Sequence, residues 1–285
     1  MSKEILEFMN VLKKVTGLSL TDEKTYLLES RLSDLMSDHK IASFYEFSKK
    51  FENSHEVDFR EKVIERITTH ETKFFRDESI FETILDRIIP EIIDRKNELY
   101  KGWKNHPIRI WSAACSTGQE PYSVAIAIRE RLPHVFKNIR ILATDIAKET
   151  IEKARSGCYT SFEIGRGLEE YHLGKYFDKL PDGTFRVNDE IRSVVEFKQH
   201  NLISSEFPSG FDLVLCRNVS YYFDSNERRN LFDKIAKTLN QDSFLIIGSA
   251  ESVSDFSSKF LLREFGLCRY YEVNSSNVTL FSRGT

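Results

Sequence analysis

The pattern of hydrophobic and polar positions divides the 285-residue chain into a helical first part and a second part in which strands and helices alternate. From residue 1 to about 70, apolar residues recur at the spacing of one helix face. Two stripes show this best: Leu27, Leu28, Leu32, Leu35 and Met36, and then Phe44, Phe47 and Phe51. No run in this part is typical of a strand, so the pattern predicts a small bundle of about four helices.

A longer helix is predicted after the segment "TTHETKFFRDESIF", residues 68–81, which joins the two parts. One broad apolar face defines this helix: Ile80, Phe81, Ile84, Leu85, Ile88 and Ile89. Pro90 interrupts the pattern, either as a kink or as the first residue of a new helix that ends near Tyr100.

Beyond residue 100 the chain changes to short apolar runs separated by helical segments. Strands are predicted at 108–113, 139–144, 194–199, 211–216, 244–249, 267–273 and 278–283, and helices at 121–132, 148–155 and 225–239. Such alternation favours an α/β fold with a doubly wound, mostly parallel sheet and helices on both faces. The last two strands flank the turn residues 274–277 and predict a terminal antiparallel hairpin, which makes seven strands in total.

Residues 157–193 interrupt this alternation and predict an insertion. Asp182-Gly183 lies between two alternating runs, which signals a β-hairpin, so we expect a small antiparallel β-subdomain here. The predicted organisation is a helical N-terminal domain over residues 1–70, a linker over 71–78, and a seven-stranded Rossmann-like domain over 79–285 that contains the insertion.

Composition indicates an ordinary globular protein, with 40% hydrophobic residues, 30% charged residues and a formal net charge of -3. This balance gives no signal for a polyanion partner, so we do not expect nucleic acid binding. No apolar run approaches the ~20 residues that span a bilayer, and the opening "MSKEILEFMNVLKK" is typical of an amphipathic helix. We therefore expect no membrane insertion and a cytoplasmic location.

The four cysteines are far apart and none has C-x-x-C spacing: Cys115, Cys158, Cys216 and Cys268. We expect reduced thiols, because neither a disulfide framework nor a zinc site is indicated. Cys115 and Cys216 are interpreted as small buried thiols, since no base or ligand set accompanies them. No metal site is assigned.

Ligands of doubly wound sheets bind outside the carboxyl ends of the strands, so the strand exits are the segments to inspect. The first exit, "RIWSAACSTGQEPYSVAI" from Arg109 to Ile126, has small residues that let a ligand approach the backbone. It has one glycine and places Glu120 at a helix start, where a carboxylate repels phosphate. This loop favours a ligand that carries positive charge.

Asp145 follows the second strand, at a place where an acid commonly accepts hydrogen bonds from ribose hydroxyls. The alternative is that Asp145 only caps the N-terminus of the helix that follows. A ribose together with a cationic group predicts S-adenosylmethionine as the ligand.

The exit of the strand at 211–216 places Arg217, Asn218, Tyr221 and Tyr222 directly after a buried strand. Asn218 can both donate and accept, which suits an adenine edge or the amine and carboxylate of a methionine. Arg217 either contacts the ligand or forms a structural salt bridge with an acid of the first loop, because an unpaired buried guanidinium would be costly.

Six segments in this order resemble the chemotaxis-receptor glutamate methyltransferases, the CheR family, over about Gly17 to Ser282. They are "TTHETKFFRDESIF", "RIWSAACSTGQEPYSVAI", "ATDIAKETIEKARSGCY", "HNLI", "FDLVLCRNVSYYF" and "GSAES". The resemblance implies a helical N-terminal domain joined to a methyltransferase domain with an inserted antiparallel subdomain. It also implies S-adenosylmethionine contacts from these residues: Thr72, Arg76, Glu120, Asp145, Asn201, Leu202, Asn218 and Val219.

His70 stands where the family usually has asparagine in its linker motif. A histidine can also donate a hydrogen bond, so we keep His70 among the expected cofactor contacts. Because an ordinary histidine gains charge below about pH 6.5, cofactor binding could respond to pH here.

The resemblance implies transfer of the sulfonium methyl to a glutamate side chain of a chemoreceptor's cytoplasmic helical domain, giving a methyl ester and S-adenosylhomocysteine. The expected enzyme is a monomer. A carboxylate is already ionised at neutral pH, so no general base is required. Arg76 and Tyr222 are the candidates for orienting the acceptor carboxylate, although Tyr222 could instead only pack, and Phe74 and Phe75 are expected to pack beside the site.

One feature departs from the family. Family members that dock on receptor helices tend to have a basic second helix, but residues 1–70 hold 11 Lys and Arg against 13 Asp and Glu. Electrostatic docking of this domain on an acidic receptor surface is therefore less expected. Two alternatives stay open, a methyltransferase for another protein carboxylate and a non-catalytic S-adenosylmethionine-binding signalling module.

Overall fold

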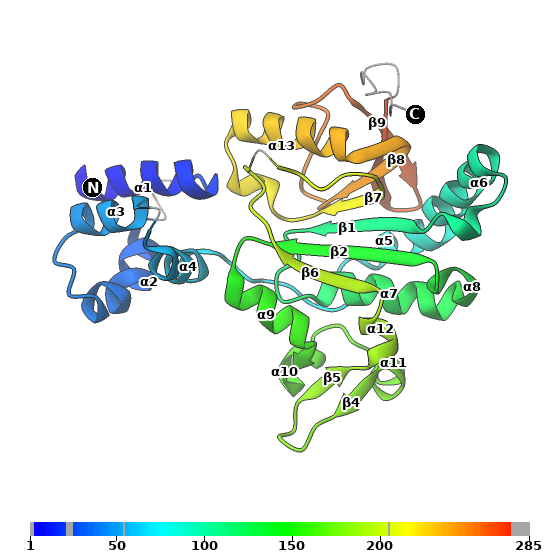
Figure 1. Cartoon of the computed structure of the whole chain (residues 1–285), viewed down its shortest axis with the longest axis horizontal. Helices are drawn as coiled ribbons and strands as arrows, with labels where there is room; N and C mark the ends of the chain where they lie inside the picture. The colour runs from blue at the N-terminus through cyan, green and yellow to red at the C-terminus, as the bar shows by residue number, and fades with distance from the viewer. Residues whose placement is uncertain (1–2, 21–24, 54, 205, 275–285) are drawn as a thin grey trace.

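The N-terminal part of the computed structural model is a four-helix bundle, as predicted (Figure 1). The structure describes residues 3–20, 25–53, 55–204 and 206–274. The bundle contains α1 (Lys3–Thr16), α2 (Thr25–Asp38), α3 (Phe44–Glu52) and α4 (Val57–Ile67). Phe8 is fully buried and packs edge to face on Phe47 and Phe51, with ring centroids 5.2 and 5.7 Å apart. These aromatic contacts hold α1 against α3.

The helix after the linker has three parts: α5 (Glu78–Thr83), a π-helical turn (Ile84–Ile88) and α6 (Ile89–Tyr100). Pro90 comes just after the π-helical turn, and Ile84, Ile88 and Ile89 all keep a right-handed helical backbone, so no separate helix begins there. The predicted interruption is a local π distortion within one continuous helix, and proline and π-turns are both common causes of such distortions. The predicted apolar face is buried against the sheet.

The central sheet has seven strands in the order β6-β2-β1-β7-β8-β10-β9. The strands are β1 (Ile108–Ala113), β2 (Ile139–Asp145), β6 (Val195–Gln199), β7 (Phe211–Cys216), β8 (Leu239–Ile247), β9 (Phe260–Phe265) and β10 (Cys268–Val273). The first five are mutually parallel, and β10 runs antiparallel to both β8 and β9. Strand order reverses beside β1, which is where ligands bind in sheets of this kind.

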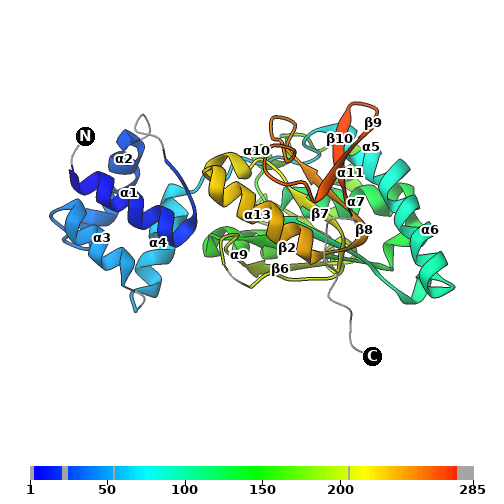
Figure 2. The same ribbon diagram turned by 90° about the horizontal axis from the view of Figure 1, so that it is seen from above.

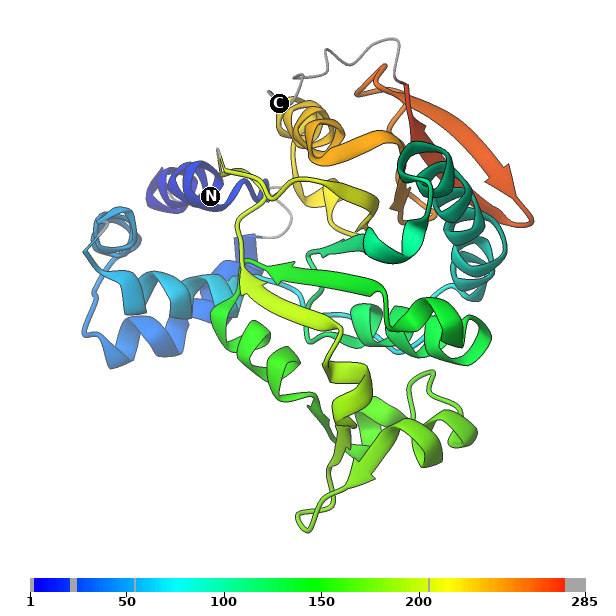
Figure 3. The ribbon, with the colours of Figure 1, turned by 45° about the vertical axis from the view of Figure 1, so that its right-hand side comes forward.

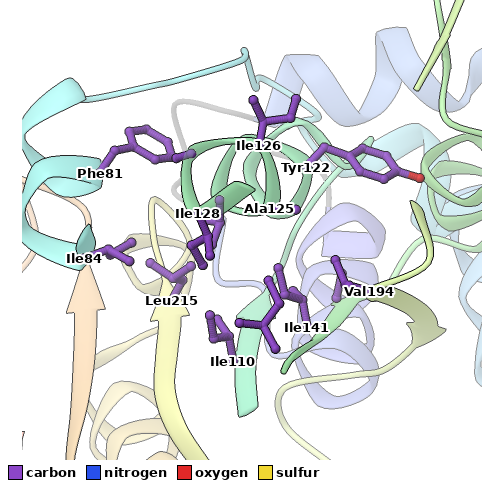
Figure 4. Packing of buried hydrophobic residues seen from close by; sticks show 14 of the residues in the cluster. Phe81, Ile84, Ile110, Tyr122, Ala125, Ile126, Ile128, Ile141, Val194 and Leu215 are labelled. Carbon is purple, nitrogen blue, oxygen red and sulfur yellow. The ribbon is translucent and has the colours of Figure 1, made fainter. Parts of the chain in front are cut away.

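Helices cover both faces of the sheet, as Figure 3 shows. Alternate strand residues separate the two cores: Ile110 and Leu215 face the layer of α5, α6, α7 (Gln119–Arg131) and α9 (Lys148–Ser156). Trp111 and Val214 face α13 (Ser225–Thr238) instead. The first of these cores is shown in Figure 4. Burial on both sides explains why all six residues of β7 are buried and why every one of them except Asp212 is apolar.

The predicted strand at 267–273 is confirmed as β10, and it belongs to an antiparallel hairpin. The described hairpin pairs β10 with β9, whereas the predicted partner, residues 278–283, lies outside the described residues. Strand β9 gave no signal because only Phe260 of its six residues is buried. An edge strand with one buried side chain has no alternating pattern to detect.

The insertion forms a separate three-stranded antiparallel sheet, as predicted. Its strands are β3 (Cys158–Tyr159), β5 (Phe185–Val187) and β4 (Phe177–Lys179), in that order, with α10 (Ser161–Ile164), α11 (Glu170–Tyr176) and α12 (Asp189–Arg192) around them. The Asp182-Gly183 turn joins β4 to β5: Asp182 accepts a 2.9 Å bond from the Thr184 N–H, and Gly183 has a φ of 84°.

The helical domain lies at one end of the molecule (Figure 2). The Asn201 side chain donates to the Val15 carbonyl at 2.9 Å, and the Ser19 N–H donates to the Tyr222 carbonyl at 2.7 Å. Gly17, with a φ of 79°, is in close contact here, since a Cβ atom would lie 2.3 Å from Ile203 Cγ2. These contacts attach the end of α1 to the strand exits. Within the described ranges, no helix has the length and apolar character needed to cross a bilayer.

Candidate cofactor and substrate site

A cavity of about 210 Å³ lies between the helical domain, the linker and the strand exits. All ten predicted site residues line it: His70, Thr72, Arg76, Glu120, Asp145, Asn201, Leu202, Asn218, Val219 and Tyr222. The helical domain also contributes to the wall, including Leu18, Leu20, Leu27, Leu28 and Arg31. The structure therefore gathers residues from four strand exits and the linker at one place.

Asp145 ends β2 and its side chain is almost fully buried. One oxygen accepts from the Ser116 N–H at 2.9 Å and the other from the Ala147 N–H at 3.1 Å. Burial raises the pKa of Asp145 above its ordinary value, and the two backbone bonds oppose that rise. The cap position of α9 is Ala147, so Asp145 is not a simple helix N-cap.

The first loop has a left-handed backbone at two residues that are not glycine. Ala114 has a φ of 59° and Ser116 a φ of 51°, a conformation that L-residues rarely adopt. The Ser116 hydroxyl donates to the His70 carbonyl at 3.3 Å, which joins the loop to the linker. Such strained backbone clusters at functional sites, where the surrounding structure maintains it.

Glu120 and Arg217 form a buried ion pair beside the cavity. Arg217 Nη1 lies 2.8 Å from Glu120 Oε2, and the Ser112 hydroxyl donates to the other Glu120 oxygen at 2.6 Å. Arg217 also pairs with Asp77 and donates to the Arg76 carbonyl at 3.1 Å. Of the two roles predicted for Arg217, the salt bridge with an acid of the first loop is the one observed.

Glu251 holds the loop that follows β7. Its carboxylate accepts backbone N–H bonds from Asn218, Val219, Ser220 and Gly248 and a bond from the Ser220 hydroxyl. The distances are 2.7 Å except for Val219, at 3.1 Å. Asn218, with a φ of 57°, is thereby fixed at the cavity edge.

His70 and Asn201 use their side chains for contacts within the protein. The His70 ring lies 3.0 Å from the Thr68 hydroxyl, 3.2 Å from the Thr150 hydroxyl and 3.4 Å from a Glu65 oxygen. The Asn201 amide donates to Val15, as described above, and accepts from the Ile203 N–H at 3.1 Å. Both residues line the cavity and also connect the two domains.

Arg76 and Tyr222 are half-buried at the cavity. Arg76 Nη1 makes a 3.3 Å bond to the Glu71 carbonyl, which leaves most of its donors free of contacts within the described chain. The Tyr222 ring packs on Tyr221 with centroids 4.5 Å apart. Phe74 is fully buried and Phe75 partly buried, which confirms the packing predicted for both.

All four cysteines are free, and Cys115 and Cys216 are buried. Burial raises the pKa of each of these two thiols well above its ordinary value, which disfavours a reactive thiolate. Across the described ranges, no three or more His, Cys, Asp or Glu side chains are grouped to hold a metal ion.

Comparison with known proteins decides the family. The model of the CheR methyltransferase all-alpha domain matches residues 3–68, and that of the CheR methyltransferase SAM-binding domain matches residues 70–265. The chain belongs to the CheR methyltransferase family. Its curated relatives include the chemotaxis protein methyltransferase of Vibrio parahaemolyticus, 34% identical over 90% of this chain and 92% of that protein.

Two further relatives agree with this assignment. Chemotaxis protein methyltransferase 1 of Pseudomonas aeruginosa is 36% identical over 89% of this chain and 91% of its own length. The chemotaxis protein methyltransferase of Borreliella burgdorferi is 35% identical over 88% of both. The predicted family, methyltransferase activity and cofactor are confirmed, and the alternative of a non-catalytic module is not favoured.

Sequence reasoning missed two groups of residues in this CheR site. Glu251 had a detectable signal, because it is an acid in the exit of β8, and exits of this sheet are where polar residues gather. The residues of the helical domain that line the cavity had no such signal in the sequence. Their place at the cavity depends on how that domain docks, which hydrophobic periodicity does not encode.

Proposed function

We propose that this CheR-family enzyme transfers the methyl group of S-adenosylmethionine to glutamate carboxylates of chemotaxis receptors. The observation that supports this most is the convergence of the linker and four strand exits on one cavity. The relatives are chemotaxis protein methyltransferases, which supports receptors of chemotaxis as the class of substrate. The glutamate acceptor rests on the family resemblance of the motifs.

The residues of the cavity fit S-adenosylmethionine. Asp145 offers carboxylate lone pairs beyond its two backbone bonds, which suits ribose hydroxyls. Asn218 offers amide groups, and the leucines of the helical domain offer an apolar wall. We assign cofactor contacts to His70, Thr72, Arg76, Glu120, Asp145, Asn201, Leu202, Asn218 and Val219.

Glu120 acts in this assignment together with Arg217. Because Arg217 already pairs with one Glu120 oxygen, the carboxylate can serve a cationic group of the ligand only alongside that ion pair. The pair fixes the orientation of Glu120 before any ligand arrives. Such preorganisation reduces the entropy lost on binding.

Arg76 and Tyr222 are the proposed catalytic residues. When bound, S-adenosylmethionine supplies the methyl group: a glutamate oxygen bonds to its carbon as the carbon–sulfur bond breaks, and S-adenosylhomocysteine leaves. The planar guanidinium of Arg76 orients the acceptor carboxylate, and the Tyr222 hydroxyl donates a hydrogen bond to it. Their contribution is alignment and water exclusion, since the acceptor needs no deprotonation.

Incubation with methyl-labelled S-adenosylmethionine and receptor cytoplasmic fragments tests this function. We expect protein-bound label that base releases as methanol, which is the property of a methyl ester. Saturable cofactor binding with no label on any fragment would support a sensor role instead. Label on a carboxylate protein other than a receptor would support the second alternative.

We propose that the enzyme acts as a cytoplasmic monomer on the helical cytoplasmic domains of receptors, without nucleic acid or membrane insertion. We also propose domain limits at 1–70, 71–78 and 79–285, with the insertion at 157–193. Light scattering of the purified chain tests the oligomeric state, and a mass of two chains would contradict the proposal.

A further inference from the structure

The linker that carries Thr72 and Arg76 is clamped by the insertion. The Phe74 ring packs edge to face on Tyr159 of β3 and on Phe177 of β4, with centroids 5.0 and 5.5 Å apart. Gly167 lies against the same residue, because a Cβ there would be 2.3 Å from the Phe74 carbonyl oxygen. A subdomain outside the main sheet thus contacts the segment beside the site.

His172 of α11 extends this clamp to Phe75. Its ring stacks on the Phe75 ring with centroids 4.9 Å apart and an interplanar angle of 17°. Phe75 also packs on Phe81 of α5, with ring centroids 5.2 Å apart. The Phe75 side chain is therefore held between the insertion and the methyltransferase core.

The backbone of Phe75 explains why it needs such support. Its φ is 49°, the left-handed region, which is an outlier for a bulky aromatic residue. A residue held there is strained and persists only where the surrounding structure over-determines its conformation. The Ser123 hydroxyl contributes by accepting the Phe75 N–H at 3.0 Å. Without the ring contacts, the backbone would relax and Arg76, the next residue, would change direction.

We propose that His172 is a positioning residue for Arg76, acting by stacking on Phe75. This inference rests on the proposed function of Arg76. Stacking, not charge, is the contact that matters: the Nδ1 atom of His172 is buried without a hydrogen bond and lies 3.8 Å from Glu169. An apolar ring at this position should therefore serve as well.

Three variants test the proposal: His172→Ala removes the ring, His172→Phe keeps it, and Glu170→Ala changes an exposed side chain at the start of the same helix. Hydrogen exchange of the Phe75 amide measures support of the linker without any need for activity. We expect exchange about tenfold faster in His172→Ala, because local opening of the linker then costs less free energy. The other two variants should exchange at rates near wild type. Unchanged exchange in His172→Ala, or equal acceleration in His172→Phe, would overturn the proposal.

Kinetics test the consequence for Arg76. In His172→Ala we expect kcat for receptor methylation to fall about tenfold, as misplacement of an orienting group does, and cofactor affinity to weaken by a smaller factor, because Arg76 is one of nine assigned cofactor contacts. His172→Phe should restore kcat, and His172→Ala should add no loss in an Arg76→Ala background. An equal further loss in that background would contradict action through Arg76. If wild-type enzyme labels no receptor, the proposed function fails, and the exchange experiment still decides the role of His172.

Discussion

Arg217 and Glu120 form an ion pair across the exits of β7 and β1, with 2.8 Å between Nη1 and Oε2 and side chains 3% and 15% exposed. Through its contacts with Asp77 and the Arg76 carbonyl, the same guanidinium holds the linker. The pair therefore connects three segments that line the cavity. Its first role is to keep the site assembled.

Replacing Arg217 by methionine should lower the free energy of unfolding by about 3 kcal/mol, because removal of one partner leaves a buried charge unpaired. Arg131→Met is the matched control: Arg131 pairs with Asp86 at 2.6 Å, but these side chains are 52% and 40% exposed. That surface pair should contribute less than about 1 kcal/mol. Urea unfolding measures both variants, and equal losses would contradict a structural role for Arg217.

Glu251→Gln should loosen the loop at 218–220. The carboxylate accepts five hydrogen bonds, and an amide nitrogen in place of either oxygen would face at least two donors. We expect a loss of about 1–3 kcal/mol in the free energy of unfolding. Weaker cofactor affinity by calorimetry should accompany it, because Asn218 and Val219 lose their support. Glu264→Gln, on the exposed face of β9, should leave both quantities unchanged.

The fold was predictable where side chains repeat with a clear period. The helices of the bundle, the five parallel strands and the Asp182-Gly183 hairpin follow directly from spacing and turn chemistry. Strand β9 was missed, because a strand with one buried residue lacks such a period. The residues of the cavity came from the rule that ligands bind at strand exits and from the family motifs.

Most hydrogen bonds and ion pairs between the residues around the site could not be predicted from the sequence. The Arg217 salt bridge with an acid of the first loop was among the predicted alternatives, but nothing local in the sequence indicates that Arg217 also pairs with Asp77 or that Asn201 bonds to Val15, 186 residues earlier. These contacts arise from the docking of whole elements. They depend on the tertiary structure, and only the structure shows them.

Cofactor affinity should fall as the pH is lowered, and the loss should begin above the ordinary titration range of an aspartate. Burial raises the pKa of Asp145, so its carboxylate takes up a proton at higher pH than an exposed one and then accepts hydrogen bonds less well. Affinity should be full above that range. Asp145→Asn should bind more weakly and lose this pH response. Calorimetry across the acid range measures it, and an identical pH response in the variant would remove Asp145 from the explanation.

Gly17→Ala should weaken the attachment of the helical domain. A left-handed φ at a residue with a Cβ costs roughly 1–2 kcal/mol, and the new Cβ would also collide with Ile203. Gly174→Ala is the control, because nothing lies within 4 Å of a Cβ there and its φ is not positive. We expect a lower melting temperature and faster proteolysis at the domain junction only in Gly17→Ala. Equal behaviour of the two variants would contradict the contact.

Peptide mass spectrometry of a receptor cytoplasmic fragment, after incubation with deuteromethyl S-adenosylmethionine, identifies the methylated group directly. We expect deuteromethyl esters on glutamate side chains, and strong loss of these esters with Arg76→Ala or Asp145→Ala. Methyl groups found only on lysine, arginine or backbone groups would contradict this expectation, as would unaltered ester formation in both variants.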